Sequence, residues 1–154
     1  RFIEYMPIGV DGFWTPDTFL SVDQMFEQLS ARYVCGEALG YGPEAGVAGQ
    51  GPARYRELSP RVGGKPSRVG FISAVSHDFC ETCNRIRLTA RGTLQPCLAV
   101  PGDLSLRDAM REGASDAAIQ SLVRDSLWGK ALGHTFDPHD GGGHVFQTMS
   151  MTGG

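Results

Sequence analysis

The sequence from residue 79 to residue 98 reads FCETCNRIRLTARGTLQPCL. It contains three of the four cysteines of the chain, Cys80, Cys83 and Cys97. Cys80 and Cys83 have the C-x2-C spacing that lets two thiolates on one tight turn bind the same metal centre. The residues after them predict a β-hairpin that turns at Gly92 and returns the chain toward Cys97. The stretch therefore predicts three thiolates that converge on one site.

The number of ligands leaves two interpretations of this site open. Three thiolates leave one coordination position open on a cluster or metal, whereas a structural zinc normally has four protein ligands. His77 lies three residues before Cys80 and can complete a Cys3His zinc site. The alternatives are thus a centre that binds substrate directly and a noncatalytic zinc module for structure or protein interaction. In either case, the crowded spacing favours metal ligands in a reducing compartment over disulfides.

Two arginines follow the second cysteine on the predicted strand 85–90. Side chains alternate along a strand, so Arg85 and Arg87 share one face, and we expect Ile86 and Leu88 to face the core. Guanidinium groups form bidentate hydrogen bonds with phosphate oxygens. The two arginines are therefore candidate phosphate ligands beside the metal site, and a solvated strand face is the alternative.

Composition and charge limit the class of protein. The chain has 154 residues, of which 41% are hydrophobic and 20% charged, and a formal net charge of −3. This length suits one domain with a hydrophobic core. The pI near 5.8 gives no basic field for nucleic acid, and no apolar run is long enough to cross a membrane. We therefore expect a cytoplasmic protein without nucleic-acid or membrane partners.

Hydrophobic spacing and turn residues predict the other elements of the chain. Ser21 and Gln24 form a capping box at the start of a helix. The predicted elements are strands at 1–6, 54–58, 68–73 and 93–98, helices at 22–32, 105–111 and 115–130, and a glycine-rich surface loop at 36–52. The residues expected on the buried face of the last helix are Ile119, Leu122, Val123 and Leu127. This mixture of helices and strands places the chain in the α/β class.

The sequence resembles the C-terminal half of the GTP 3′,8-cyclase family, radical S-adenosylmethionine enzymes of molybdenum cofactor biosynthesis. The most specific match is the C-x2-C-x13-C spacing with Asn84-Arg85-Ile86-Arg87 after its second cysteine. The resemblance spans essentially the whole chain. Its other matches are RFIEYM at 1–6, GPARY at 51–55, FIS at 71–73, WGK at 128–130 and the closing Gly153-Gly154.

The resemblance implies a cofactor and a fold. Cys80, Cys83 and Cys97 would bind a second [4Fe-4S] cluster, with one iron left without a protein ligand so that the guanine of GTP can coordinate it. Residues 1–154 would form a single C-terminal domain that binds the cluster and GTP. This domain would be the closing part of an incomplete (β/α) TIM-like barrel, extended by a cluster-binding β-hairpin and helices.

The resemblance also implies a reaction and its substrate-binding residues. The family converts GTP to 3′,8-cyclo-7,8-dihydroguanosine 5′-triphosphate. Residues that match Arg85, Arg87 and Arg1 line the GTP pocket, and the Gly153-Gly154 tail reaches toward the active site. The resemblance further allows a homodimer of the full-length protein.

One family motif does not occur in these 154 residues. It is the C-x3-C-x2-C motif of the cluster that binds S-adenosylmethionine. We therefore expect S-adenosylmethionine to be bound only by the absent N-terminal radical half, and the isolated chain to be catalytically inactive. Cys35 lies outside the cluster spacing and is expected to pack as a small hydrophobic residue. His134, His139 and His144 lack the spacing of metal ligands, so we expect no metal site in the tail.

Overall fold

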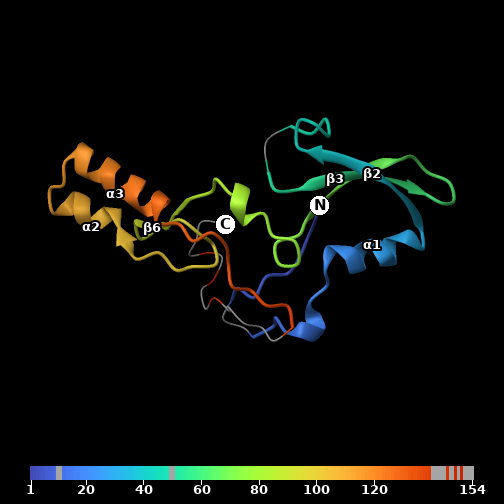
Figure 1. Ribbon diagram of the computed structural model, residues 1–154, viewed down its shortest axis with the longest axis horizontal. Coiled ribbons are helices and arrows are strands. Elements are labelled where there is room, and N and C mark those ends of the chain that lie inside the picture. The colour runs from blue at the N-terminus through green and yellow to red at the C-terminus, as the bar shows by residue number, and fades with distance from the viewer. Residues whose placement is uncertain (10–11, 49–50, 140–144, 146–147, 149, 151–154) are drawn as a thin grey trace. The chain divides into compact units, whose positions relative to one another are not determined.

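The computed structural model describes residues 1–9, 12–48, 51–139, 145, 148 and 150 (Figure 1). The chain divides into two compact units. The first comprises Arg1–Met6 and Asp17–Phe79, and the second comprises Pro7–Pro16 and Cys80–Gly154. The short 3-10 helix η1 (Pro16–Thr18) lies where the chain passes from one unit to the other. No helix in the described part of the chain is long and apolar enough to cross a lipid bilayer.

The first unit contains a four-stranded mixed sheet with the strand order β1-β4-β3-β2. Its strands are β1 (Phe2–Ile3), β2 (Tyr33–Tyr41), β3 (Arg54–Pro60) and β4 (Ser67–Ile72). β1 pairs parallel with β4, whereas β3 pairs antiparallel with both of its neighbours. The expected mixture of helices and strands is confirmed. One parallel pair does not amount to the repeated parallel strands of a (β/α) barrel, so that part of the fold stays a prediction.

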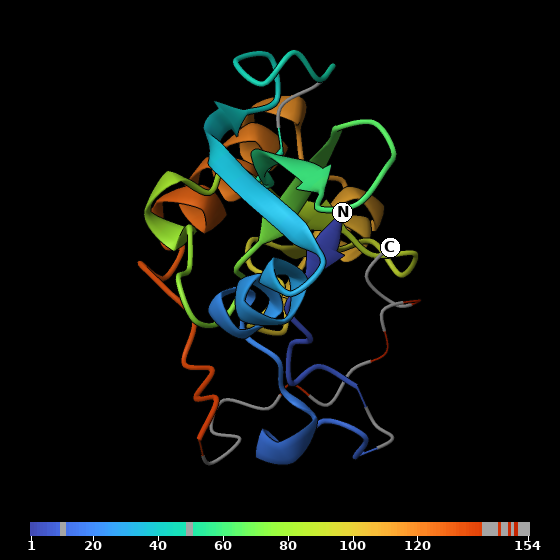
Figure 2. The same ribbon diagram turned by 90° about the vertical axis from the view of Figure 1, so that its right-hand side faces the viewer.

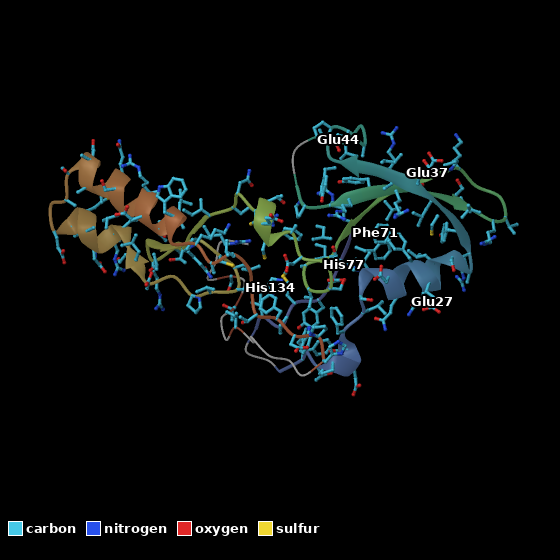
Figure 3. The ribbon with its side chains drawn as sticks, viewed as in Figure 1. Glu27, Glu37, Glu44, Phe71, His77 and His134 are labelled. Atoms are coloured by element: carbon cyan, nitrogen blue, oxygen red, sulfur yellow. The ribbon has the colours of Figure 1, made fainter. Side chains whose placement is uncertain are left out.

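Helix α1 (Val22–Ser30) covers one face of this sheet (Figures 1 and 2). The predicted capping box is present, since the Gln24 N–H donates to Ser21 Oγ at 3.2 Å and the Ser21 N–H donates to Gln24 Oε1 at 2.9 Å. Val22 and Met25 pack against Leu58 and Phe71 in the core of the unit. Figure 3 shows Phe71 between the sheet and the helix. The predicted helix is therefore confirmed, and it ends two residues earlier than expected.

The glycine-rich segment 36–52 was expected to be a loop, and this is wrong for its first part, which forms β2. Two register shifts between β2 and β3 accommodate the unusual composition. Gly40 has a φ of +83°, a conformation that other residues rarely adopt. A Cβ on Gly36 would lie 3.1 Å from the carbonyl oxygen of Glu57 on the neighbouring strand. Glycine here permits a close, irregular strand pairing.

The second unit contains a three-stranded sheet with the order β5-β6-β7 and a helical hairpin. Its elements are the 3-10 helix η2 (Cys80–Thr82), strands β5 (Arg87–Leu88), β6 (Thr93–Gln95) and β7 (Leu104–Ser105), and helices α2 (Leu106–Arg111) and α3 (Asp116–Trp128). α2 and α3 lie side by side in Figure 1 and pack against each other. Both predicted helices are therefore confirmed, with shorter bounds.

The apolar face of α3 is less covered than expected. Helix α3 has no buried residue, and Leu127 is 44% exposed, whereas the other three apolar residues of this face are half-buried. The prediction of a fully buried face is therefore wrong. α2 is six residues long and α3 thirteen, so α2 covers only part of this face.

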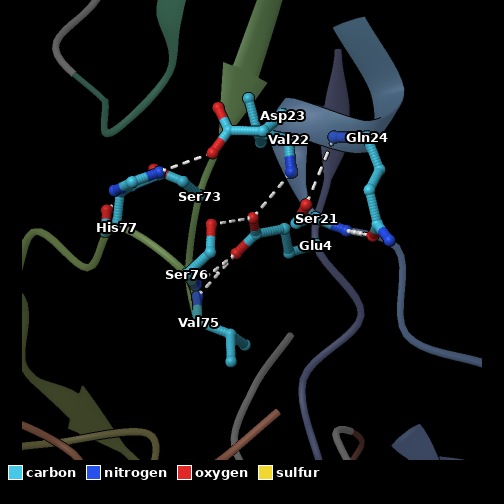
Figure 4. A network of polar contacts seen from close by, with 9 residues as sticks. All are labelled: Glu4, Ser21, Val22, Asp23, Gln24, Ser73, Val75, Ser76 and His77. Atoms are coloured by element: carbon cyan, nitrogen blue, oxygen red, sulfur yellow. Dashed lines mark hydrogen bonds and ion pairs between the residues drawn. The ribbon is translucent and has the colours of Figure 1, made fainter. Parts of the chain in front are cut away.

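A buried carboxylate connects three segments of the first unit. Glu4 is fully buried and accepts hydrogen bonds from the N–H groups of Val22 at 2.8 Å, Val75 at 2.8 Å and Ser76 at 2.9 Å (Figure 4). The Ser76 hydroxyl donates a further hydrogen bond to it. Val22 is the first residue of α1, so the carboxylate also meets the positive end of the helix dipole. Four donors compensate for the loss of water around this charge.

We expect the substitution Glu4→Gln to lower the free energy of unfolding by about 2 kcal/mol, because an NH2 group would then face backbone N–H donors. Urea denaturation followed by circular dichroism measures this change. Glu27→Gln is the matched control, since Glu27 lies exposed on α1 (Figure 3) and its substitution should change stability by less than about 0.5 kcal/mol. Equal stability of the two variants would show that the Glu4 contacts contribute nothing.

Candidate metal centre and substrate-binding arginines

The first two cysteines of the candidate site lie on one tight turn. Cys80–Thr82 forms the 3-10 helix η2, and the Cys83 N–H donates to the Cys80 carbonyl oxygen at 3.1 Å. Neither thiol is in a disulfide, and both residues are half-buried. The predicted turn at the C-x2-C motif is therefore confirmed.

The β-hairpin after this turn leads to the third cysteine. β5 and β6 pair antiparallel, with Arg87 opposite Gln95, and Cys97 follows two residues later. The thiol of Cys97 is also free and half-buried. The hairpin turns at Gly92, where φ is +80° and a Cβ would lie 2.5 Å from the Cβ of Arg107. The predicted hairpin is confirmed, although its strands are shorter than expected.

Lys130 binds the C-x2-C turn directly. Its Nζ donates to the carbonyl oxygens of Cys83 at 2.9 Å and Arg85 at 3.2 Å, and to Cys83 Sγ at 3.3 Å. Partial burial raises the pKa of the Cys83 thiol, but a backbone hydrogen bond at Arg85 and the Lys130 ammonium outweigh it and lower this pKa below its ordinary value. The environment of Cys83 thus favours the thiolate, the form that binds metal.

Arg85 and Arg87 are half-buried, whereas Ile86 and Leu88 are 38% and 57% exposed. The alternation of the two pairs is as expected, but the expectation that the apolar pair faces the core is wrong. The aliphatic part of an arginine side chain can pack against the backbone, just as an apolar side chain can. Arg85 and Arg87 therefore lie on the more covered side of the chain as it leaves the cysteine turn.

The donor set of the three cysteines indicates which metal group fits the site. Thiolates are soft ligands, typical of zinc and of iron–sulfur clusters. A tetrahedral zinc with Zn–S distances of about 2.3 Å holds its sulfur ligands about 3.8 Å apart. Among the described residues, Cys80, Cys83 and Cys97 do not form a group of sulfurs within 4.8 Å of one another. The described positions therefore do not bring the three sulfurs together at zinc-ligand distances, and their convergence on one metal group stays a prediction.

His134, which its spacing had ruled out as an expected metal ligand, lies close to the first cysteine. One of its ring nitrogens and Cys80 Sγ lie within 4.8 Å of each other. The ring stacks on Phe136 with centroids 4.4 Å apart, and Nδ1 accepts the Phe136 N–H at 3.2 Å. Figure 3 shows His134 in the segment that follows α3. No spacing rule relates residues so far apart in the sequence, so the pattern gave no signal for this neighbour.

Arg1, the third candidate substrate-binding arginine, belongs to the first unit. Its Nε donates to the Tyr55 hydroxyl at 2.7 Å, and its guanidinium lies 5.8 Å from the centre of the Tyr55 ring. Both residues line a cavity of about 200 Å³ together with Ala53 and Ile72. The side chain of Arg1 therefore has a defined position at a hollow of its own unit.

His77, the fourth ligand of the zinc interpretation, also belongs to the first unit. Its Nε2 lies 2.9 Å from Asp23 Oδ2 in an exposed pair (Figure 4). The imidazole thus has a carboxylate partner, and its role as a zinc ligand stays a prediction. His144 and the Gly153-Gly154 tail lie outside the described residues.

Comparison with known proteins decides the family. The family model described as Molybdenum Cofactor Synthesis C matches residues 1–136. The chain is 38% identical to the GTP 3′,8-cyclase of Heliobacterium modesticaldum over 154 residues, which cover 100% of this chain and 44% of the relative. The chain belongs to the Molybdenum Cofactor Synthesis C family. The chain is also 34% identical to the GTP 3′,8-cyclase of Rhodococcus opacus and 37% identical to that of Brucella ovis. These two matches cover 100% and 99% of this chain, and 41% and 42% of the relatives.

The Molybdenum Cofactor Synthesis C family assignment confirms the resemblance seen in the cysteine spacing and the Asn-Arg-Ile-Arg sequence. It covers both compact units, since the match runs from Arg1 to beyond α3. The chain spans less than half the length of these curated GTP 3′,8-cyclases and corresponds to a C-terminal part of them. The cyclase activity named for these relatives is that of proteins more than twice as long as this chain.

Proposed function

We propose that this chain is the C-terminal portion of a GTP 3′,8-cyclase and binds a [4Fe-4S] cluster and GTP. The observation that carries the proposal is the turn with the reduced cysteines Cys80 and Cys83, in which Lys130 contacts the sulfur of the second cysteine. In the complete protein, this portion would take part in converting GTP to 3′,8-cyclo-7,8-dihydroguanosine 5′-triphosphate.

In this proposal, the cluster ligands are Cys80, Cys83 and Cys97. Their soft donor atoms and the lowered pKa of Cys83 support a metal group bound by thiolates, and the family match supports an iron–sulfur cluster as that group. When bound, a four-iron cluster with three thiolate ligands supplies one iron that the guanine of GTP can coordinate. The chain's own contribution is to hold three thiolates and leave the fourth position open.

The triphosphate of GTP would be bound by Arg85, Arg87 and Arg1. The formal net charge of −3 gives the molecule no general attraction for anions, so a phosphate site must use local cations. Arg85 and Arg87 are half-buried, which strengthens their electrostatic interaction with phosphate compared with fully exposed side chains. Their role is to neutralise and position the substrate.

The radical step would use residues outside this chain. S-adenosylmethionine would bind to an N-terminal half that also supplies the preceding strands of an incomplete (β/α) barrel, to which β1 would add. The 154-residue chain would therefore bind GTP without cyclising it. The complete protein would act in the cytoplasm and could form a homodimer.

The test of this function is GTP binding to the anaerobically purified protein with and without a reconstituted cluster. We expect the cluster to strengthen GTP binding at least about tenfold, because one coordination bond to guanine is gained. ATP, which has the same triphosphate but a different base, should gain much less. Equal GTP affinity of the metal-free and reconstituted proteins would contradict the proposal.

A zinc-binding structural or protein-interaction module is the second candidate, and the imidazole of His134 beside Cys80 favours it. Such a module would bind one zinc ion without sulfide, and chelation of the zinc would unfold it. It would show no response to GTP, so the same binding experiment separates the two functions.

A further inference from the structure

We propose that Lys130 is a positioning residue that fixes the C-x2-C turn and places a positive charge against the thiolate of Cys83. The inference rests on the proposed function, since it concerns a residue that would touch a cluster ligand. The sequence alone gives Lys130 no role beyond its place in the WGK match.

The contacts of Lys130 use the full donor capacity of its ammonium group. An ammonium has three N–H donors, and three acceptors lie within reach: Cys83 O at 2.9 Å, Arg85 O at 3.2 Å and Cys83 Sγ at 3.3 Å. The two carbonyl groups belong to the backbone that leaves the turn toward β5. One side chain thereby fixes both the ligand and the start of the hairpin strand.

The end of α3 places Lys130 at this position. Gly129 caps the helix and donates its N–H to Asp125 O at 2.9 Å, and the Lys130 N–H donates to Leu127 O at 3.3 Å. The lysine backbone is therefore tied to the last turn of the helix. The side chain then reaches a turn that lies 47 residues earlier in the chain.

A cation next to a ligand sulfur affects the two oxidation states of a cluster differently. Reduction adds one electron, supplied by an external reductant, and makes the cluster more negative by one charge. The Lys130 ammonium stabilises the more negative state more strongly, so it raises the reduction potential. Hydrogen bonds to ligand atoms also hold the metal more firmly.

The test uses charge-removing variants of the only two lysines in the sequence. Lys130→Met should shift the reduction potential of the reconstituted cluster to a lower value and release iron to a chelator about ten times faster. Lys130→Gln should show the same lowered potential, and Lys130→Arg, which keeps the charge, should remain closer to the wild type. Lys65→Met is the matched control, because Lys65 is exposed in the turn between β3 and β4 and its loss should change neither quantity.

Redox titration followed by electron paramagnetic resonance and timed iron release measure these effects in the reconstituted protein. Wild-type potential in both Lys130→Met and Lys130→Gln would overturn the inference, and Lys130→Gln decides if the methionine variant does not fold. Iron and sulfide analysis of the wild type separates the two proposals. A wild-type protein without a cluster contradicts the proposed function itself, whereas a wild-type cluster that is insensitive to Lys130 contradicts only this inference.

Discussion

We expect alanine at Cys80, Cys83 or Cys97 to abolish cluster assembly, so that each single variant retains less than about a tenth of the wild-type iron after anaerobic reconstitution. The effect is large because a cluster attached by three thiolates has no spare protein ligand. The loss of one thiolate would leave only two protein ligands to hold the proposed cluster. Iron and sulfide analysis of the purified variants measures the result.

Cys35→Ala is the matched control for these three variants. Its thiol is also free and half-buried, but it lies on β2 and packs beside the core residues Leu58 and Phe71. We expect this substitution to keep the full iron content while it lowers stability slightly. A full iron complement in Cys80→Ala would refute the ligand assignment, and loss of iron in Cys35→Ala would show that the measurement reports folding.

We expect replacement of Arg85 and Arg87 together by alanine to weaken GTP binding about 100-fold and to leave the proposed cluster intact. Hydrogen bonds to charged groups contribute about 1.5–3 kcal/mol each, and 1.4 kcal/mol corresponds to tenfold in affinity. Equilibrium binding of GTP and guanosine to the reconstituted protein measures the effect. Guanosine has no phosphate, so its affinity should change little, and the advantage of GTP over guanosine should shrink.

The control pair for the arginine experiment is Arg111→Ala with Arg124→Ala. These residues are exposed on α2 and α3 of the same unit, and their removal changes the net charge by the same amount. We expect GTP affinity within about threefold of the wild type, since exposed charges are strongly screened. If the Arg85/Arg87 double variant binds GTP as well as this control pair does, Arg85 and Arg87 are not phosphate ligands.

Local signals predicted much of the fold. The capping box at Ser21 and Gln24 placed the start of α1, and Gly92 placed the hairpin turn, because both depend on neighbouring residues. β2 was missed because glycine has a low intrinsic preference for strands. Pairing with β3 overrides that preference through register shifts that need Gly36 and Gly40.

Contacts between distant segments could not be predicted from the sequence. The spacing of the three cysteines is a local pattern, and it identified the candidate ligands. Lys130 and His134 reach the cysteine turn only because the chain returns after α3, and no periodicity encodes that approach. The exposure of Ile86 and Leu88 was also missed, since alternation along a strand fixes which residues share a face but not which face is covered.

The most direct test of the central claim is the iron, sulfide and zinc content of the anaerobically reconstituted protein, with its absorption spectrum before and after addition of GTP. The three-thiolate cluster predicts about four irons and four sulfides per chain, little zinc, and a spectrum that changes with GTP. One zinc ion per chain, no sulfide and no response to GTP would contradict the claim and establish the zinc module in its place.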